Sequence, residues 1–226
     1  MHLHILRKGK VEPLEAMELY PASKMPFEVA RVHKYLSGDV LELNWRWKMY
    51  DELYMKDENL NLLNESDSKM FGLVQNSLID NILLLICRAT DPYKSGAKGI
   101  NESLTFDLLN TVLLTHSDSQ LIGKFEKERD RLRIFVKEAK DARNKRIGHN
   151  DLPSIVANKS FPIKVDSLNE IIAGLGGLLN LVEDYFDDSP VHYQESSLKD
   201  DGNELLSRLA IARKHINRRT GTICCC

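Results

Sequence analysis

A short segment at the end of a strongly basic region holds the residues with the clearest chemical potential. Arg143, Asn144, Arg146 and His149 lie within seven consecutive positions. An Arg guanidinium matches the oxygens of a phosphate, an imidazole exchanges a proton near neutral pH, and an Asn side chain both donates and accepts hydrogen bonds. RNA transesterification needs a base for the 2′-hydroxyl, a positive group for the phosphorane and an acid for the leaving 5′-oxygen. The segment therefore predicts cleavage of RNA without a metal ion.

The spacing of Arg143 and His149 does not by itself bring the two side chains together. On a straight helix they are separated by about 9 Å of rise and roughly 120° of rotation. Two copies related by a twofold axis would solve this, because each would bring an Arg and a His to one shared cleft. The alternative is structural: Arg143 pairs with Asp141 or Asp151, and His149 bonds the last carbonyl groups of its helix. The spacing alone leaves both interpretations open.

The helix expected to carry this segment is strongly cationic. The chain as a whole has a net charge of −2, but residues 124–146 hold ten Lys and Arg against five Asp and Glu. This asymmetry favours one basic face, on which Lys140, Lys145 and Arg146 are candidate phosphate-binding residues. Charged helices are also common as solvated surfaces, so the charge alone does not identify RNA as the ligand.

The composition is typical of a globular cytoplasmic protein. The chain has 226 residues, of which 42% are hydrophobic and 28% charged, enough for one large domain or a compact domain with appendages. Its longest apolar runs are shorter than the roughly 18 residues of a membrane-spanning helix, and its first residues do not resemble a secretory signal. Cys87 and the terminal Cys224–Cys226 have neither disulfide nor zinc-site spacing. We therefore expect a cytoplasmic location, no membrane contact, no metal and no cofactor.

Apolar residues recur mainly at helical spacing, which predicts an all-α fold, a helical bundle with long antiparallel helices. A long helix should begin after Ser117-Asp118-Ser119 and end at Gly148. The other helices are expected over residues 39–55, 68–90, 104–114, about 167–185 and 204–217. The resulting domain division is an N-terminal arm over 1–38, the bundle over 39–187, and a C-terminal helix and tail over 188–226.

Local signals define several details of these helices. The helix over 68–90 should stop at Asp91-Pro92, and its apolar residues predict burial on nearly all sides. The segment Ser167–Glu170 is a capping box that should open the following helix. Gly174, Gly176 and Gly177 do not have the spacing of a phosphate-binding loop, and we expect them to allow close approach between helices.

Three separated segments resemble a known superfamily. Ala142–Leu152, ARNKRIGHNDL, is similar to the motif of the HEPN superfamily, an Arg and a polar residue followed after four to six positions by a His. It looks especially like the AbiU-type abortive-infection branch. Phe71–Gln75 and Asp80–Pro92 resemble the same branch, in which an Arg-x-x-Asp-Pro segment closes the corresponding helix. The resemblance covers roughly residues 39–185.

This resemblance implies a dimeric helical bundle, a metal-independent endoribonuclease activity in many members, and a role in phage defence or in toxin–antitoxin systems. Arg143 and His149 match the catalytic pair of the motif, and Asn144 matches its polar companion. We expect a homodimer that acts on RNA, with an antitoxin or another defence protein as a further partner. Two alternatives remain: a non-catalytic HEPN scaffold that binds RNA, a nucleotide or a protein, and an interaction protein whose Arg and His only hold the dimer together.

Overall fold

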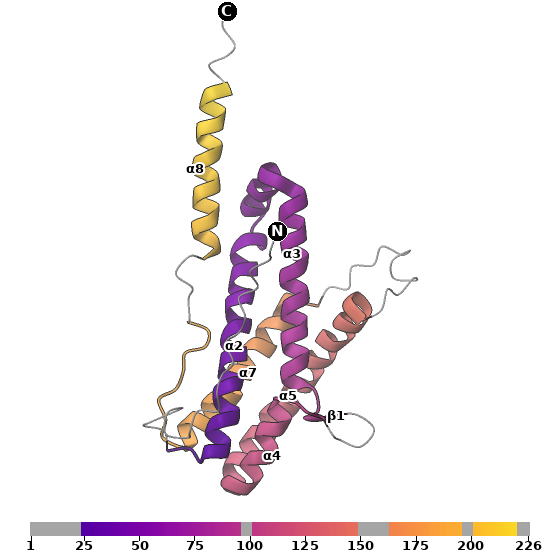
Figure 1. The fold of residues 1–226 in the computed structure, drawn as a ribbon, viewed down its shortest axis with the longest axis vertical. Helices are drawn as coiled ribbons and strands as arrows, with labels where there is room; N and C mark the ends of the chain where they lie inside the picture. The colour runs from indigo at the N-terminus through magenta and orange to yellow at the C-terminus, as the bar shows by residue number, and fades with distance from the viewer. Residues whose placement is uncertain (1–23, 96–100, 149–162, 196–200, 221–226) are drawn as a thin grey trace, which may run out of the picture.

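The computed structural model describes residues 24–95, 101–148, 163–195 and 201–220, and most of them are helical (Figure 1). The α-helices are α2 (Phe27–Tyr54), α3 (Asp57–Thr90), α4 (Phe106–His116), α5 (Ser119–Arg143), α7 (Val165–Tyr185) and α8 (Gly202–Thr220), and a π-helix, η1 (Asn144–Gly148), follows α5. Two-residue strands β1 (Lys94–Ser95) and β2 (Asn101–Glu102) pair antiparallel between α3 and α4. The predicted all-α fold is confirmed.

Two antiparallel helix pairs build the body of the protein. Helices α2 and α3 form a long hairpin, and α5 and α7 form a second pair that crosses this hairpin at an incline (Figure 1). Helix α4 packs against α2 and α5. One continuous hydrophobic core joins these five helices, and its fully buried side chains include Leu36, Leu43, Ile82, Ile86, Leu109, Phe125, Ile171 and Leu179.

Helix α2 begins earlier than the sequence predicts. The expected start was Asp39, whereas the helix begins at Phe27, directly after Pro26. The apolar stripe of the later turns continues into this part at helical spacing. The buried residues of the extension include Val29, Val32 and Leu36. Residues 27–38, expected in the N-terminal arm, are therefore helical, while the division of the chain into three domains stays a prediction.

Helix α3 is bent at Asp67, whose backbone angles of φ −166° and ψ 92° are not helical. The Asp67 carboxylate accepts a hydrogen bond from the Met70 N–H at 3.0 Å and so caps the second part of the helix. The predicted start at residue 68 coincides with this bend. The end at Thr90 agrees with the predicted stop at Asp91-Pro92.

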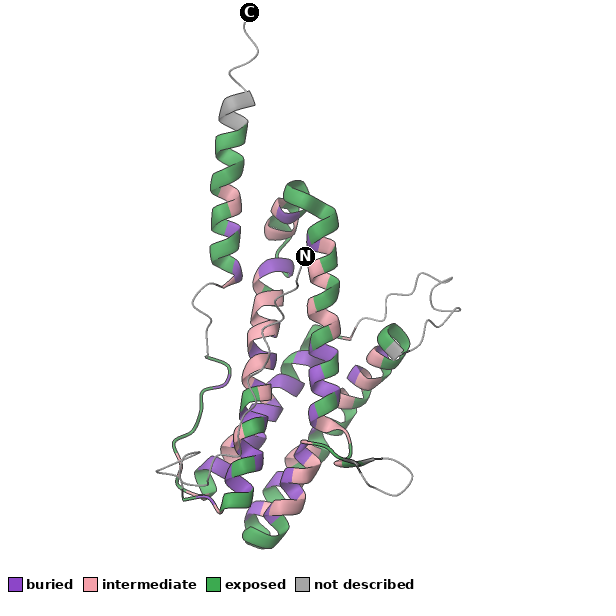
Figure 2. Cartoon of the chain, in the orientation of Figure 1, coloured by how far each residue is buried: buried purple, intermediate pink, exposed green. Residues whose placement is uncertain are grey.

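One face of α3 is not covered. Met70, Leu73 and Leu84 are 57%, 68% and 37% exposed, so the prediction of burial on nearly all sides is wrong. Figure 2 shows that the buried residues of α3 gather in the part that crosses the other helices. The apolar residues of this helix thus exceed what the core of one chain uses.

By length and composition alone, α3 and α7 could each span a membrane, which the short apolar runs of the sequence did not indicate. Both helices supply buried side chains to the core described above. Core helices of compact bundles have the same composition as membrane spans of this length. The expected absence of membrane contact stays a prediction.

Helix α5 begins as the sequence predicts and ends in an unexpected conformation. The Asp118 Oδ1 atom accepts hydrogen bonds from the N–H groups of Gln120 and Leu121, both at 2.9 Å, which confirms the predicted cap. At its other end the helix continues past Arg143 into η1, which ends at Gly148 as expected. The last turn is therefore a π turn, which is wider than an α turn.

The start of α7 differs from the prediction. The helix begins at Val165, and Lys164 before it makes no side-chain cap. The Ser167 hydroxyl, expected to cap the helix, donates instead to Glu138 Oε2 of α5 at 2.7 Å. The predicted capping box is wrong because its serine serves a contact between two helices.

The glycines of α7 allow close approach at two of their three positions. A Cβ atom on Gly174 would meet the side chain of Leu132 in α5, and one on Gly176 would lie 3.4 Å from Tyr193. Nothing lies within 4 Å of the corresponding position on Gly177. The predicted role in helix packing therefore holds for Gly174, whereas Gly176 faces Tyr193 of the segment that follows α7.

Helix α8 packs on the far end of the α2–α3 hairpin and projects beyond it (Figure 1). The Gly202 N–H donates to Glu52 Oε2 at 2.9 Å, and Arg213 forms an ion pair with Glu65. A second, smaller hydrophobic cluster fastens the helix through Leu53, Tyr54, Leu63, Phe71 and Leu206.

Candidate functional site

The predicted site residues lie where α5 ends. Arg143 is the last residue of α5, and Asn144, Lys145 and Arg146 belong to η1. His149 lies outside the described residues, so its position relative to Arg143 stays a prediction. Asn144, Lys145 and Arg146 are exposed, whereas Arg143 is half-buried.

Arg143 lies against the buried face of α3. Its Nε atom is enclosed and has no hydrogen-bond partner among the described residues. Its neighbour is Cys87, a core residue that is 2% exposed, as predicted. Burial raises the pKa of the Cys87 thiol, and the charge and hydrogen bonding of Arg143 oppose part of that rise.

The structural alternative for Arg143, an ion pair with Asp141 or Asp151, stays a prediction. Within the described ranges, Arg143 forms no ion pair with Asp141, and Asp151 lies outside those ranges. Among the described residues no carboxylate forms an ion pair with this half-buried guanidinium. Its Nε atom lacks a described hydrogen-bond partner, whereas enclosed polar groups are usually hydrogen-bonded.

Arg146 is tied to the outer side of α3. Its Nε atom forms an ion pair with Asp80, and its Nη2 atom donates to Asn76 Oδ1 at 2.8 Å. The Arg146 and Asp80 side chains are 37% and 36% exposed. The pair is therefore open to solvent, where such contacts contribute little to stability and exchange readily for other partners.

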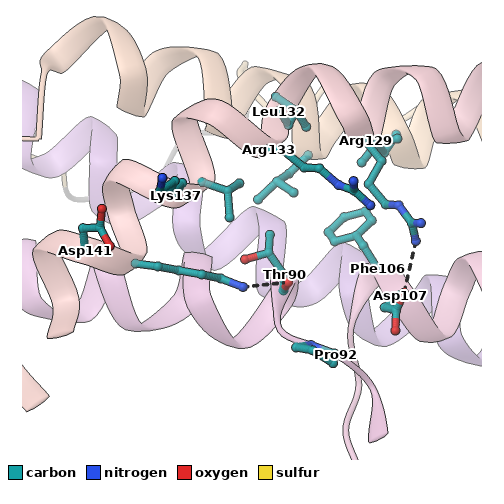
Figure 3. A pocket seen from close by; sticks show the side chains of 13 residues that line it. Thr90, Pro92, Phe106, Asp107, Arg129, Leu132, Arg133, Lys137 and Asp141 are labelled. Atoms are coloured by element: carbon teal, nitrogen blue, oxygen red, sulfur yellow. Dashed lines mark hydrogen bonds and ion pairs between the residues drawn. The ribbon is translucent and has the colours of Figure 1, made fainter.

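Lys140 is also held by α3. Its Nζ atom lies 2.8 Å from Asp91 Oδ1 and donates to the Thr90 carbonyl at 3.0 Å, a contact drawn in Figure 3. The basic end of α5 thus lies along α3 in antiparallel register. Lys140 faces Asp91, Arg143 faces Cys87, and Arg146 faces Asp80.

The π turn changes the geometry expected for the motif. In a straight α-helix, Arg143 and a residue six positions later point in different directions. Residues Asn144–Gly148 form a wider π turn instead, and such turns occur frequently at functional sites. No group of three or more His, Cys, Asp or Glu side chains that could hold a metal ion occurs in the part of the chain that the structure describes.

An all-α bundle whose long cationic helix ends in an Arg-containing turn has the architecture of a HEPN domain. The family model described as AbiU2 matches residues 28–208, from the first turn of α2 into α8. The chain therefore belongs to the AbiU2 family of HEPN domains, and the resemblance to the AbiU-type branch is confirmed. No curated protein and no solved structure matches the chain.

Sequence reasoning located the cations of the site but missed their partners on α3. Asp80 lies on α3, and Asp91 is the first residue after that helix, eleven residues further along the chain. Both residues belong to the segment that resembles the AbiU-type branch. Neither residue carries a local signal that links it to α5, so the sequence does not identify them as counter-charges of the basic helix.

Proposed function

We propose that this protein is a metal-independent endoribonuclease of a phage-defence or toxin–antitoxin system, with an active site completed by a second copy of the chain. The position of Arg143 carries this proposal. A half-buried guanidinium that forms no ion pair with a described carboxylate lies at the end of the most basic helix, immediately before the turn that leads to His149. Membership of the AbiU2 family supports it.

The proposed reaction is an attack of the ribose 2′-hydroxyl on the adjacent phosphorus. His149 takes the 2′-hydroxyl proton as general base and returns a proton to the leaving 5′-oxygen as general acid. Arg143 binds the scissile phosphate and stabilises the negative charge of the phosphorane, and Asn144 orients the phosphate or the imidazole. The products are a 2′,3′-cyclic phosphate and a free 5′-hydroxyl, so neither water nor a metal enters the first step.

The uncovered face of α3 supports a homodimer. Met70, Leu73 and Leu84 fall on one stripe of the helix because their spacings of three and eleven residues are close to whole turns. All three are exposed, and only 33% of the most apolar window of α3 is buried within one chain. An exposed apolar face of this kind is typical of a protein–protein contact. Since Arg143 and Arg146 pack on the same helix, a copy docked there would lie near the site.

Cleavage in the presence of EDTA tests the proposed activity. Purified protein should cut single-stranded RNA and leave 2′,3′-cyclic phosphate ends, and His149→Ala and Arg143→Ala should each lower the rate by about 10²-fold or more. Circular dichroism would confirm that both variants keep their helices. Cleavage that persists in His149→Ala at the wild-type rate would remove His149 from the mechanism.

The ion pairs of Arg146 and Lys140 favour a second candidate, a non-catalytic HEPN module that binds RNA, a nucleotide or a protein as a dimeric scaffold. Two of the cations predicted to bind phosphate are already partnered by Asp80 and Asp91. A pure binding module would show salt-dependent affinity for RNA with intact RNA recovered from the complex. An antitoxin, another defence partner and a cytoplasmic location remain predictions for either candidate.

A further inference from the structure

A cavity of about 470 Å³ lies beside the predicted site, between α5 and the helices that flank it (Figure 3). This volume falls within the range of about 300–1,000 Å³ that is typical of ligand-binding pockets. The cavity follows α5 from Arg129 to Asp141 and therefore ends two residues before Arg143. Its remaining walls come from the end of α3, the start of α4 and the middle of α7.

The floor of this cavity is apolar. It consists of Phe106 of α4, Leu132 and Val136 of α5, and Leu175 and Leu178 of α7. Phe106 and the three leucines are at most 2% exposed, so they are fixed parts of the core. The Phe106 ring lies toward the middle of the cavity in Figure 3. A rigid apolar floor with an aromatic ring suits a flat, apolar group such as a nucleobase.

The rim is basic, and two of its cations face solvent. Arg129 is held by Asp107 at 3.2 Å, and Lys140 by its contacts with the end of α3. Arg133 is 70% exposed, and its ion pair among the described residues is with Asp130, 3.2 Å away on its own helix. Lys137 is exposed and forms no ion pair in the part of the chain that the structure describes. Arg133 and Lys137 are therefore available to a phosphate above the apolar floor.

The orientation of α5 links this cavity to Arg143. Arg129, Val136 and Arg143 recur every seven residues and so lie on nearly the same stripe of the helix. Lys137 precedes Arg143 by about 9 Å along the helix axis, and Arg133 by about 15 Å. Arg133 and Lys137 lie roughly 80° and 120° around the helix from Arg143, so a strand that passes them in order must wind around the end of α5 to reach the predicted cleavage position.

We infer that the cavity binds one unpaired base of a single-stranded RNA, with the phosphates beside that base held by Arg133 and Lys137. This inference rests on the proposed function, because it takes RNA as the substrate and adds the subsite that sets its position. The base lies on Phe106, Val136 and the leucines of the floor. The next phosphates along the strand then reach the end of α5, where Arg143 lies. A duplex cannot bind in this way, since its bases are stacked and paired.

Titration of two oligomers against three variants tests the subsite. The first probe is a fluorescent single-stranded RNA of twelve nucleotides with 2′-O-methyl sugars, which cannot be cleaved, and the second is its abasic counterpart. Val136→Trp fills the cavity from a half-buried wall position, and Lys137→Ala removes one exposed charge from the rim. Lys124→Ala is the matched control, because it removes an equally exposed lysine from the same helix outside the cavity.

For the base-containing oligomer, Val136→Trp should weaken binding roughly fivefold or more, the lower end of what one stacked base contributes. The same variant should bind the abasic oligomer as the wild type does. Lys137→Ala should lower affinity and reduce the slope of log K against log salt by about 1, as expected for one lost phosphate contact. Equal binding of the base-containing oligomer by wild type and Val136→Trp would overturn the inference. Equal losses of RNA affinity in Lys137→Ala and Lys124→Ala would also overturn it. So would a free mononucleotide that binds as tightly as the oligomer.

Cleavage of unmodified RNA by the same proteins separates this inference from the proposed function. If the wild type cleaves RNA while the cavity variants bind normally, the base subsite is wrong and the nuclease proposal stands. If the wild type does not cleave but the cavity variants lose affinity, the nuclease proposal is wrong and the base subsite stands.

Discussion

Gly174 of α7 lies directly against Leu132 of α5, and a Cβ atom built on Gly174 would be 2.4 Å from Leu132 Cδ2 and 3.0 Å from its Cγ. Leu132 is 2% exposed and cannot turn away into solvent. This contact sets how closely the two helices approach. Since Leu132 also forms part of the cavity floor, the same contact fixes the shape of that cavity.

Gly174→Ala should therefore destabilise the protein by about 1–3 kcal/mol, the usual cost of overpacking a core. Urea unfolding followed by circular dichroism measures the change. Gly177→Ala is the control, because a Cβ at that position meets nothing within 4 Å and Ala favours the helix over Gly. A Gly174→Ala variant as stable as Gly177→Ala would show that α5 and α7 are further apart than described.

A buried polar network holds the segment after α7. Glu183 Oε1 accepts a hydrogen bond from the Tyr193 hydroxyl at 3.0 Å and lies 3.2 Å from His33 Nε2, and Oε2 accepts from the Val191 N–H at 2.9 Å. Burial raises the pKa of Glu183, but His33 and the hydrogen bonds from Val191 and Tyr193 outweigh it, so the pKa is lowered from its ordinary value. The Glu183 carboxylate therefore binds a proton less readily in the folded state than in the unfolded chain.

Because the folded pKa lies below the ordinary value of about 4.3, Glu183 stabilises the fold above that pH and loses this effect as the pH falls through the folded pKa. Glu183→Gln should cost about 1.5–3 kcal/mol near neutral pH, the range for hydrogen bonds to a charged group. The difference between wild type and variant should shrink between about pH 5 and pH 3 in urea titrations, since the wild-type carboxylate becomes protonated. A difference that stays constant over this range would contradict a lowered pKa for Glu183.

The ion pair between Arg146 and Asp80 makes a separate prediction about RNA. If Arg146 binds phosphate, Asp80 competes with RNA for its guanidinium, and Asp80→Asn should raise RNA affinity severalfold at low salt. Stability should change by less than about 1 kcal/mol, because both side chains are more than a third exposed. Glu65→Gln is the matched control, since it frees Arg213 of α8 in the same way. If Asp80→Asn left RNA affinity unchanged, Arg146 would not bind phosphate and would serve only to pack η1 on α3.

The features predicted correctly from the sequence depend on neighbouring residues. Asp118 caps α5 through bonds to residues two and three positions later, and Asp91-Pro92 ends α3 through the backbone restriction of proline. Features that depend on distant contacts were missed. Ser167 bonds Glu138 of another helix instead of capping its own, and Leu84 on α3 is exposed because none of the described helices covers it.

In the candidate site, too, local features were predicted and features that depend on distant contacts were missed. Arg143, Asn144 and Arg146 were found because the motif lies within one short segment of the chain. Asp80, the partner of Arg146, is sixty-six residues away in sequence, and no pattern near Arg146 indicates it. The cavity beside α5 was missed for the same reason, since its floor combines residues of three helices.

The central claim is that Arg143 and His149 of two chains act on one phosphate, and mixed dimers test it most directly. Arg143→Ala and His149→Ala chains with different tags would be co-expressed, and the heterodimer purified through both tags. A site built across the interface retains one Arg and one His in this heterodimer, so it should cleave RNA in EDTA well above either mutant homodimer. A heterodimer no more active than the two homodimers, beside an active wild type, would contradict a site shared between the chains.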